Sequence, residues 1–254
     1  MPITTIATHI EPGPQAASQA SVVLSVAQGF GARVTALAFA AEVTTGEPPA
    51  EPAIMTEAAR LNVHCETRGR TSYAQGIGPE LAAQGRVSDL VVLPVSGLPS
   101  PAERMLLDAA IFDSGRPVLV LPPGTSAAQP QRVAIAWDGS VAAVRAAHNA
   151  MPFLEKAESV LVIFVTDDKE PRQADSGEAL TALLLRHSLR ASYLPIQRAG
   201  RTVLEALCST ARQNGASLLA MGCLRHSPLR DVVFGSATTD LLHGEASLAV
   251  LASA

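Results

Sequence analysis

The stretch SLLAMGCLRHSPLRDVVFGSATTD, residues 217–240, decides how the fold of this chain is interpreted. An apolar run meets Gly222 and a basic loop, and Gly235-Ser236 then opens a new helical segment. The exposed N–H groups and positive dipole end of such a helix suit an anion such as phosphate. An ordinary strand-to-helix surface loop with turn glycines has the same local features, so the spacing of the glycines has to separate the two interpretations.

Outward from this stretch, apolar strands and amphipathic helices alternate along the whole chain. The predicted strands are 3–11, 33–42, 63–67, 89–95, 117–121, 132–137, 160–165, 193–197, 218–221 and 248–251. Helices are predicted over 16–30, 53–61, 73–84, 102–112 and 141–156. Two further helices are predicted to follow the capping boxes Asp175–Glu178 and Thr202–Glu205, and another is predicted to begin at Gly235. Parallel strands joined by right-handed helical crossovers form an open doubly wound sheet, whose ligands bind at the carboxyl ends of the strands.

The strand and helix pattern occurs twice, and a Pro- and Gly-rich linker at 122–130 separates the copies. DLVVLP (89–94) matches SLLAMG (217–222), and PVLVL (117–121) matches SLAVL (247–251). We therefore predict an α/β chain of two tandem doubly wound domains, 1–124 and 131–254, each with a five-stranded parallel sheet flanked by helices. Unpaired edges of the last strands favour packing of the two halves as a pseudo-twofold pair.

Composition excludes several classes of function. The 254 residues are 48% hydrophobic with a net charge of −4, and there is no basic run with interleaved aromatics that would indicate nucleic-acid binding. The three cysteines are widely spaced and predict reduced thiols, with neither disulfide nor metal site. We find no signal peptide, membrane span, P-loop or nucleophile elbow, so we expect a cytoplasmic protein without assigned catalytic residues.

The glycine spacing resembles the signature of the universal stress protein family. Its nucleotide-binding members carry Gly, two residues, Gly, nine residues, then Gly-Ser or Gly-Thr. Here Gly222 and Gly235-Ser236 hold the first and third places, and Arg225 replaces the middle glycine. The resemblance covers nearly the whole chain in pattern, but the motif residues occur only in the second half. It implies an adenine nucleotide alpha-hydrolase-like fold.

The same resemblance implies a binding site for ATP or another adenine nucleotide in the second domain. Asp138, at the end of that domain's first strand, would hold the adenine side, although Asp-Gly-Ser is also a common turn. The base pocket would be lined by Ala136, Trp137 and Val165. The phosphate side would be formed by Gly222, Arg225, Gly235, Ser236, Ala237 and Thr238, with helix capping as the alternative role of Ser236.

When the two copies of the repeat are aligned, His9 of the first half corresponds to Asp138, Pro94 to Gly222, and Met105-Leu106 to Gly235-Ser236. A proline without an N–H group and two bulky side chains oppose phosphate binding, so this half is predicted to be a degenerate, structural domain.

The resemblance thus implies a cytoplasmic universal stress protein that binds an adenine nucleotide weakly in its C-terminal domain. It would act in the stress response through conformation or partners, as an intramolecular pseudo-dimer that is also able to form a homodimer. One alternative is a scaffold or dimer-forming member that binds no nucleotide, which Arg225 favours. Another is a slow ATP hydrolase, for which the sequence offers no base and no metal ligand beyond Asp138.

Overall fold

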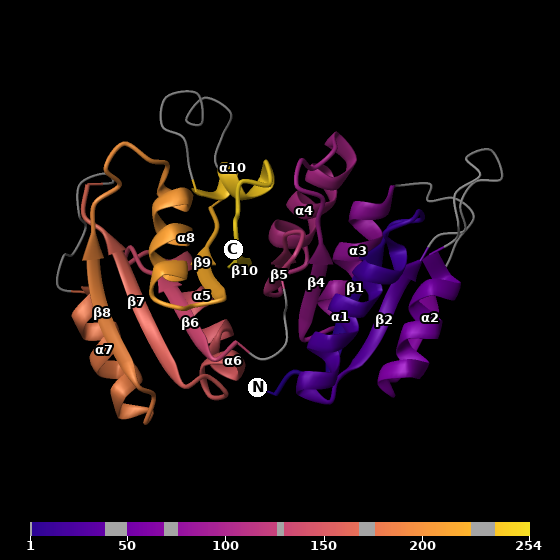
Figure 1. The fold of residues 1–254 in the computed structure, drawn as a ribbon, viewed down its shortest axis with the longest axis horizontal. Helices are drawn as coiled ribbons and strands as arrows, with labels where there is room; N and C mark the ends of the chain where they lie inside the picture. Colours follow the sequence, from indigo (N-terminus) through magenta and orange to yellow (C-terminus); the bar gives the residue numbers. More distant parts are fainter. Residues whose placement is uncertain (1, 39–49, 69–75, 126–129, 168–175, 225–236) are drawn as a thin grey trace. The chain divides into compact units, whose positions relative to one another are not determined.

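The computed structural model describes residues 2–38, 50–68, 76–125, 130–167, 176–224 and 237–254 (Figure 1). The chain forms two compact units. The first contains Met1–Val95 and Ser100–Ala128, and the second contains Ser96–Pro99 and Gln129–Ala254. The assignment of 1–124 and 131–254 as two domains of one family stays a prediction.

The first unit is built on a parallel sheet with the strand order β3-β2-β1-β4-β5. Its strands are β1 (Thr5–Ile10), β2 (Arg33–Ala38), β3 (Cys65–Arg68), β4 (Leu90–Pro94) and β5 (Val118–Leu121). Every residue of β5 and all of β4 except Pro94 are buried, as expected for parallel strands covered on both faces.

In the described part of this unit, the sheet is covered by α1 (Ala16–Phe30), α2 (Ala50–Leu61), α3 (Ile77–Arg86) and α4 (Pro101–Asp113). α1 packs with α2, and α3 packs with α4. The crossovers from β1 to β2 and β3 run in one direction along the sheet, and those from β3 to β4 and β5 run in the other. Right-handed crossovers in opposite directions place the two helix pairs on opposite faces of the sheet. α1 ends where Gly31 adopts a left-handed conformation with φ of 65°. α4 begins with a capping box, in which Ser100 and Glu103 satisfy each other's backbone N–H groups.

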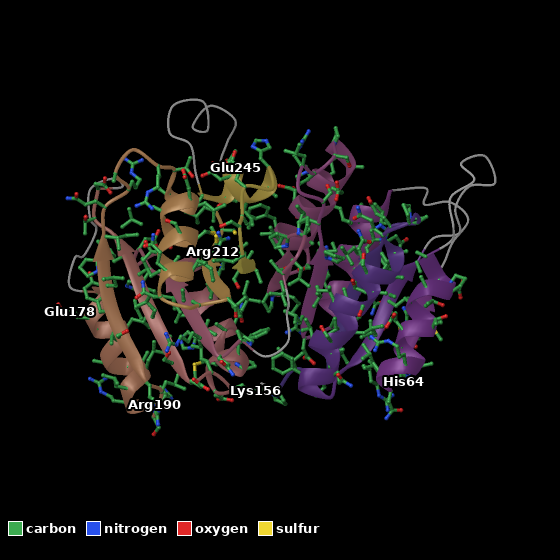
Figure 2. All side chains as sticks on the ribbon, viewed as in Figure 1. His64, Lys156, Glu178, Arg190, Arg212 and Glu245 are labelled. Atoms are coloured by element: carbon green, nitrogen blue, oxygen red, sulfur yellow. The ribbon has the colours of Figure 1, made fainter. Side chains whose placement is uncertain are left out.

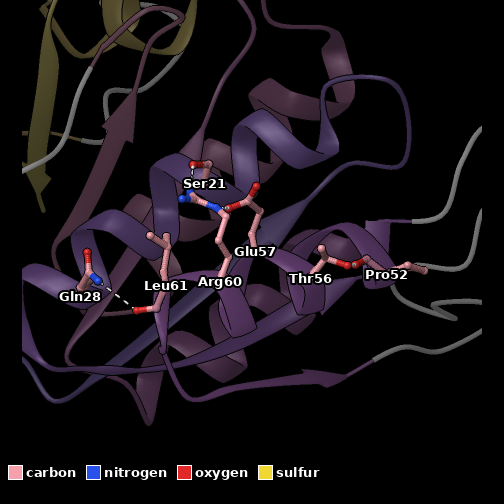
Figure 3. A network of polar contacts seen from close by, with 7 residues as sticks. All are labelled: Ser21, Gln28, Pro52, Thr56, Glu57, Arg60 and Leu61. Atoms are coloured by element: carbon pink, nitrogen blue, oxygen red, sulfur yellow. Dashed lines mark hydrogen bonds and ion pairs between the residues drawn. The ribbon is translucent and has the colours of Figure 1, made fainter.

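Polar contacts join α2 to α1 (Figure 3). The Arg60 guanidinium donates to Glu57 Oε2 at 2.7 Å and to Ser21 Oγ of α1 at 3.4 Å. Gln28 Nε2 of α1 donates to the Leu61 carbonyl at 3.0 Å, which satisfies an acceptor at the C-terminal end of α2. Arg60 and Gln28 are exposed, so these contacts orient the two helices more than they stabilise them.

The second unit repeats the arrangement with the parallel order β10-β9-β6-β7-β8. Its strands are β6 (Arg132–Ala136), β7 (Ser159–Val165), β8 (Ala191–Ile196), β9 (Leu218–Gly222) and β10 (Ala249–Ser253). Its helices are α5 (Val141–Asn149), α6 (Met151–Leu154), α7 (Ser176–Arg186), α8 (Val203–Gln213) and α10 (Ala237–Leu242). Thr202 caps α8 by accepting from the Glu205 amide at 3.2 Å.

The predicted fold class is confirmed, whereas three predicted helices differ from the observed ones by three residues or more at one end. The helix predicted over 141–156 ends at Asn149, and α6 follows, because Pro152 has no N–H group with which to continue the hydrogen-bond ladder. α3 begins at Ile77, after Gly76 with φ of 85°, so Gly76 precedes the helix. α2 begins at Ala50, three residues before its predicted start, since a proline in the first turn costs no hydrogen bond.

Charged side chains lie on the outside of both units. In Figure 2, His64 points outward from the first unit, as do Lys156 and Arg190 from the second, and all three are exposed. None of the helices in the described part of the chain combines the length and apolar composition that crossing a bilayer requires.

Candidate functional site

The second unit has a topological switch point between β6 and β9. β6 pairs with β7 on one side and with β9 on the other, and the chain passes from β6 through α5 to β7 but reaches β9 only after α8. The crossovers on the two sides of β6 therefore run in opposite directions. Open α/β sheets bind ligands outside the carboxyl ends of the strands at such a point.

Asp138 lies just beyond the carboxyl end of β6. It is exposed, and its Oδ1 accepts from the Ser140 amide at 2.9 Å. Ser140 in turn caps α5, because its Oγ accepts from the Ala143 amide at 3.1 Å. Gly139 between them has φ of 74°. Asp138 therefore has the turn role expected of Asp-Gly-Ser and also presents a carboxylate to solvent at the end of the strand.

The three residues proposed for the base pocket lie at the ends of adjacent strands. Ala136 ends β6, Val165 ends β7, and the Trp137 amide donates to the Ile163 carbonyl at 2.9 Å. All three are partly exposed. The Trp137 indole is oriented by a hydrogen bond of 3.0 Å from Nε1 to Ser176 Oγ, at the start of α7.

Tyr193 of β8 is a residue of this region that the sequence did not indicate. Its ring occupies the space next to Gly177 in the first turn of α7, where a Cβ atom would overlap it. The β8 pattern predicts only a strand, whereas the contact depends on how α7 packs on the sheet. Tyr193 thus holds the end of α7 that carries the Trp137 partner Ser176.

Gly222 ends β9, and the structure gives it a packing role. A Cβ atom at this position would lie 2.5 Å from the Ala142 carbonyl carbon and from the Ala143 amide nitrogen, both in the first turn of α5. Real Cβ atoms do not approach backbone this closely. Glycine is therefore needed here for the approach of α5 to β9, whether or not a phosphate group binds nearby.

Thr238 of α10 is 7% exposed and bonded inside the protein. Its Oγ1 accepts from the Leu224 amide at 3.3 Å, and its side chain also hydrogen-bonds to the Cys223 thiol. Burial raises the pKa of Cys223 to about 12, although Thr238 favours the thiolate, so this thiol is inert. Ala237, the first residue of α10, is half-buried. Arg225, Gly235 and Ser236 lie outside the described residues.

The described residues hold no group of three or more His, Cys, Asp or Glu side chains suited to a metal ion. What the geometry brings together is an exposed carboxylate, an oriented indole and two strand ends at a switch point.

Similar folds occur among solved structures. The chain aligns over 97% of its length with 95% of a universal stress protein from Archaeoglobus fulgidus, at 14% identity and a TM-score of 0.65. The chain has the universal stress protein fold. A putative universal stress protein from Pseudomonas aeruginosa UCBPP-PA14 has 17% sequence identity and a TM-score of 0.61. That alignment covers 99% of this chain and 93% of that protein. A functionally unknown protein from Pseudomonas aeruginosa PAO1 has 15% sequence identity and a TM-score of 0.62. That alignment covers 99% of this chain and 92% of that protein. By sequence, no family model and no curated protein matches the chain.

Strand pairing corrects one expectation about the first unit of this universal stress protein fold. Ile6 of β1 lies opposite Leu90 of β4, and Val133 of β6 lies opposite Leu218 of β9. Since 89–94 matches 217–222, Ile6 corresponds to Val133. Counting onward along each strand, Glu11 corresponds to Asp138. The assignment of His9 as the counterpart of Asp138 is therefore wrong, because the sequence pattern did not determine the register of β1.

His9 instead corresponds to Ala136 and belongs to the interior of the first unit. It is 7% exposed, and its Nδ1 lies 2.8 Å from the Leu37 carbonyl oxygen. Burial lowers the pKa of His9 to about 4, outweighing the opposite effects of the Leu37 carbonyl and the Glu103 carboxylate. The imidazole is therefore neutral at pH 7, and the bond to a carbonyl requires the tautomer with the proton on Nδ1.

Proposed function

We propose that this chain is a cytoplasmic universal stress protein that binds an adenine nucleotide, ATP or AMP, weakly in its second unit. It acts in the stress response through the conformation or partners that the nucleotide selects. The observation that carries the proposal is the position of Asp138 and Gly222, at the carboxyl ends of the two strands that flank the switch point.

The contacts around Asp138 support a base-binding role. Its Oδ1 is engaged with the Ser140 amide, and a carboxylate oxygen accepts more than one hydrogen bond, so the side chain is able to take an amine or hydroxyl donor as well. Trp137, Ala136 and Val165 present partly exposed apolar surface on the adjacent strand ends. Phosphate groups would then extend toward Gly222 and the Gly235-Ser236 segment that precedes α10.

The first experiment is to look for nucleotide that copurifies with the protein, by its absorbance ratio and by mass spectrometry. Calorimetric titration with AMP and ATP then measures affinity and stoichiometry. We expect Asp138→Ala to abolish detectable binding and the matched control Asp113→Ala, an exposed aspartate of the first unit, to leave it unchanged. Binding that survives Asp138→Ala would refute the assigned site.

A second candidate is a scaffold with no bound nucleotide, and specific contacts favour it. Gly222 is explained by the approach of α5, and Thr238 Oγ1 is engaged with the Leu224 amide. Two of the proposed phosphate residues therefore have structural roles of their own. Absence of copurified nucleotide, together with no calorimetric response to AMP or ATP at millimolar concentration, would establish this candidate over the first.

A further inference from the structure

The first unit has a small cavity at the carboxyl ends of β1 and β4, at the position equivalent to the proposed nucleotide site of the second. Its volume is about 10 Å³, which is room for a group the size of one water molecule. It is lined by His9, Glu11, Gln19, Leu93, Pro94, Val95, Glu103, Leu106 and Leu107. All of these residues lie in the described part of the first unit.

The polar atoms of this lining are mainly hydrogen-bond acceptors. Glu11 and Glu103 supply carboxylates, and Glu103 uses one oxygen to accept from the Ser100 amide at 2.7 Å. His9 donates from Nδ1 to the Leu37 carbonyl, which makes its Nε2 an acceptor atom. Gln19 Oε1 is buried without a hydrogen-bond partner, an arrangement that folded proteins rarely leave unsatisfied.

The charge of the lining is negative. The described residues that line the cavity include two carboxylates and neither lysine nor arginine. A phosphate group would be repelled and would find few donors. A metal ion is disfavoured as well, since the described residues form no metal-binding group of His, Cys, Asp and Glu.

We propose that this cavity binds the primary ammonium group of a small amine. Such a group has the size of a water molecule, carries three N–H donors and one positive charge, and so matches the volume, the acceptors and the charge of the lining. Gln19 Oε1 and the carboxylates of Glu103 and Glu11 are the acceptors that it would meet. The first unit would then be a second ligand site, of the opposite charge preference to the proposed nucleotide site and independent of it.

The test is a titration with methylammonium, followed by the ring resonances of His9 in NMR spectra of the full chain. Comparison with His9→Gln assigns these resonances among those of the six histidines. Tetramethylammonium is the control ligand, because it has the same charge but no N–H donor. We expect a saturable shift with methylammonium and none with tetramethylammonium.

Two variants test the lining. Glu103→Gln removes the charge but keeps the capping box of α4, and Gln19→Met removes the buried acceptor at nearly constant volume. Each should weaken methylammonium binding by roughly tenfold or more. Glu155→Gln, the same change at an exposed site in the second unit, should have no effect. Thermal melting checks that every variant is folded.

Equal shifts with both ligands, no saturable shift, or unchanged binding in both lining variants would overturn the proposal. An arm with Nα-acetyl-lysine amide separates the two sources of an ammonium group. Binding at least as tight as that of methylammonium indicates a protein lysine, whereas binding of methylammonium alone indicates a free amine. Failure of this site would leave the nucleotide proposal untouched, since the probes and variants concern the first unit only.

Discussion

The carboxyl ends of the first and fourth strands carry different chemistry in the two units. In the second unit, Asp138 is exposed after β6 and Gly222 ends β9. In the first, Glu11 occupies the place of Asp138, while a buried histidine and Pro94 stand where the second unit has Ala136 and Gly222. The same fold therefore presents an open surface in one unit and a small acceptor-lined cavity in the other.

The two units also differ at the end of the fourth strand, beside the first helix of each unit. The first turn of α5 approaches Gly222 so closely that no Cβ atom fits. The corresponding strand of the first unit ends in a proline side chain, which lines the cavity together with Gln19 of α1. Glycine at the end of the fourth strand thus accompanies close packing of the first helix in the second unit. Proline at the same place accompanies a small cavity in the first unit.

The largest expected effect comes from Gly222→Ala. The new methyl group would meet the α5 backbone at 2.5 Å, and backbone cannot move aside as a flexible side chain does. We expect a loss of about 3 kcal/mol in the free energy of unfolding, measured by urea denaturation. Pro94→Ala, the matched change in the first unit, should cost at most about 1 kcal/mol. Equal losses would show that the two strand ends are packed alike.

The next effect is the pH dependence of folding stability that His9 gives to the first unit. The pKa of His9 is about 4 in the folded protein against 6.5 for an unperturbed histidine, so the unfolded chain binds the extra proton between these values. This contribution to stability is complete above pH 6.5 and is lost as the pH falls toward 4. The loss at the lower limit is about 3 kcal/mol.

Urea denaturation at a series of pH values measures this dependence. His9→Gln should have a flatter profile between pH 6.5 and 4, whereas His64→Gln, at an exposed position, should keep the profile of the parent protein. A profile of His9→Gln that is as steep as the parent's would show that His9 is not the group responsible.

A smaller effect concerns the two equivalent carboxylates. If only the second unit binds nucleotide, calorimetry should give one AMP site per chain, and Glu11→Ala should leave its affinity unchanged. Asp138→Ala should weaken binding by roughly tenfold or more, the value of a hydrogen bond to a charged group, and this loss makes the weak binding undetectable by calorimetry. Trp137 is the one tryptophan of the chain, so its emission should change on titration with AMP. Two sites, or a loss caused by Glu11→Ala, would remove the distinction between the units.

The smallest expected effect is that of Arg225→Gly, which restores the glycine of the family pattern in a segment outside the described residues. Glycine removes a cost of roughly 1 kcal/mol if the loop needs φ above zero, so ATP affinity should rise about fivefold while AMP affinity changes little. Parallel titrations with both nucleotides measure this difference. A fall in ATP affinity would instead identify Arg225 as a phosphate ligand.

Local patterns were sufficient for much of this fold. The apolar spacing over 16–30 and the glycine after it predicted α1 with its observed bounds, because helix periodicity and C-capping involve only residues close in sequence. The apolar runs of β4, β5 and β9 likewise predicted buried parallel strands. The short helix after α5 was missed because a single proline was outweighed by an otherwise continuous helical pattern.

The sequence by itself determined the order of strands and helices, the repeat, and the candidate residues at the strand ends, because these follow from local periodicity and spacing. Tertiary structure alone decided that Glu11, not His9, corresponds to Asp138, since register depends on pairing between distant strands. It also decided that Gly222 is needed by α5, and that Gln19, whose Oε1 is buried without a hydrogen-bond partner, lines a small cavity. These features depend on the distance between a helix and a sheet, which no stretch of sequence contains.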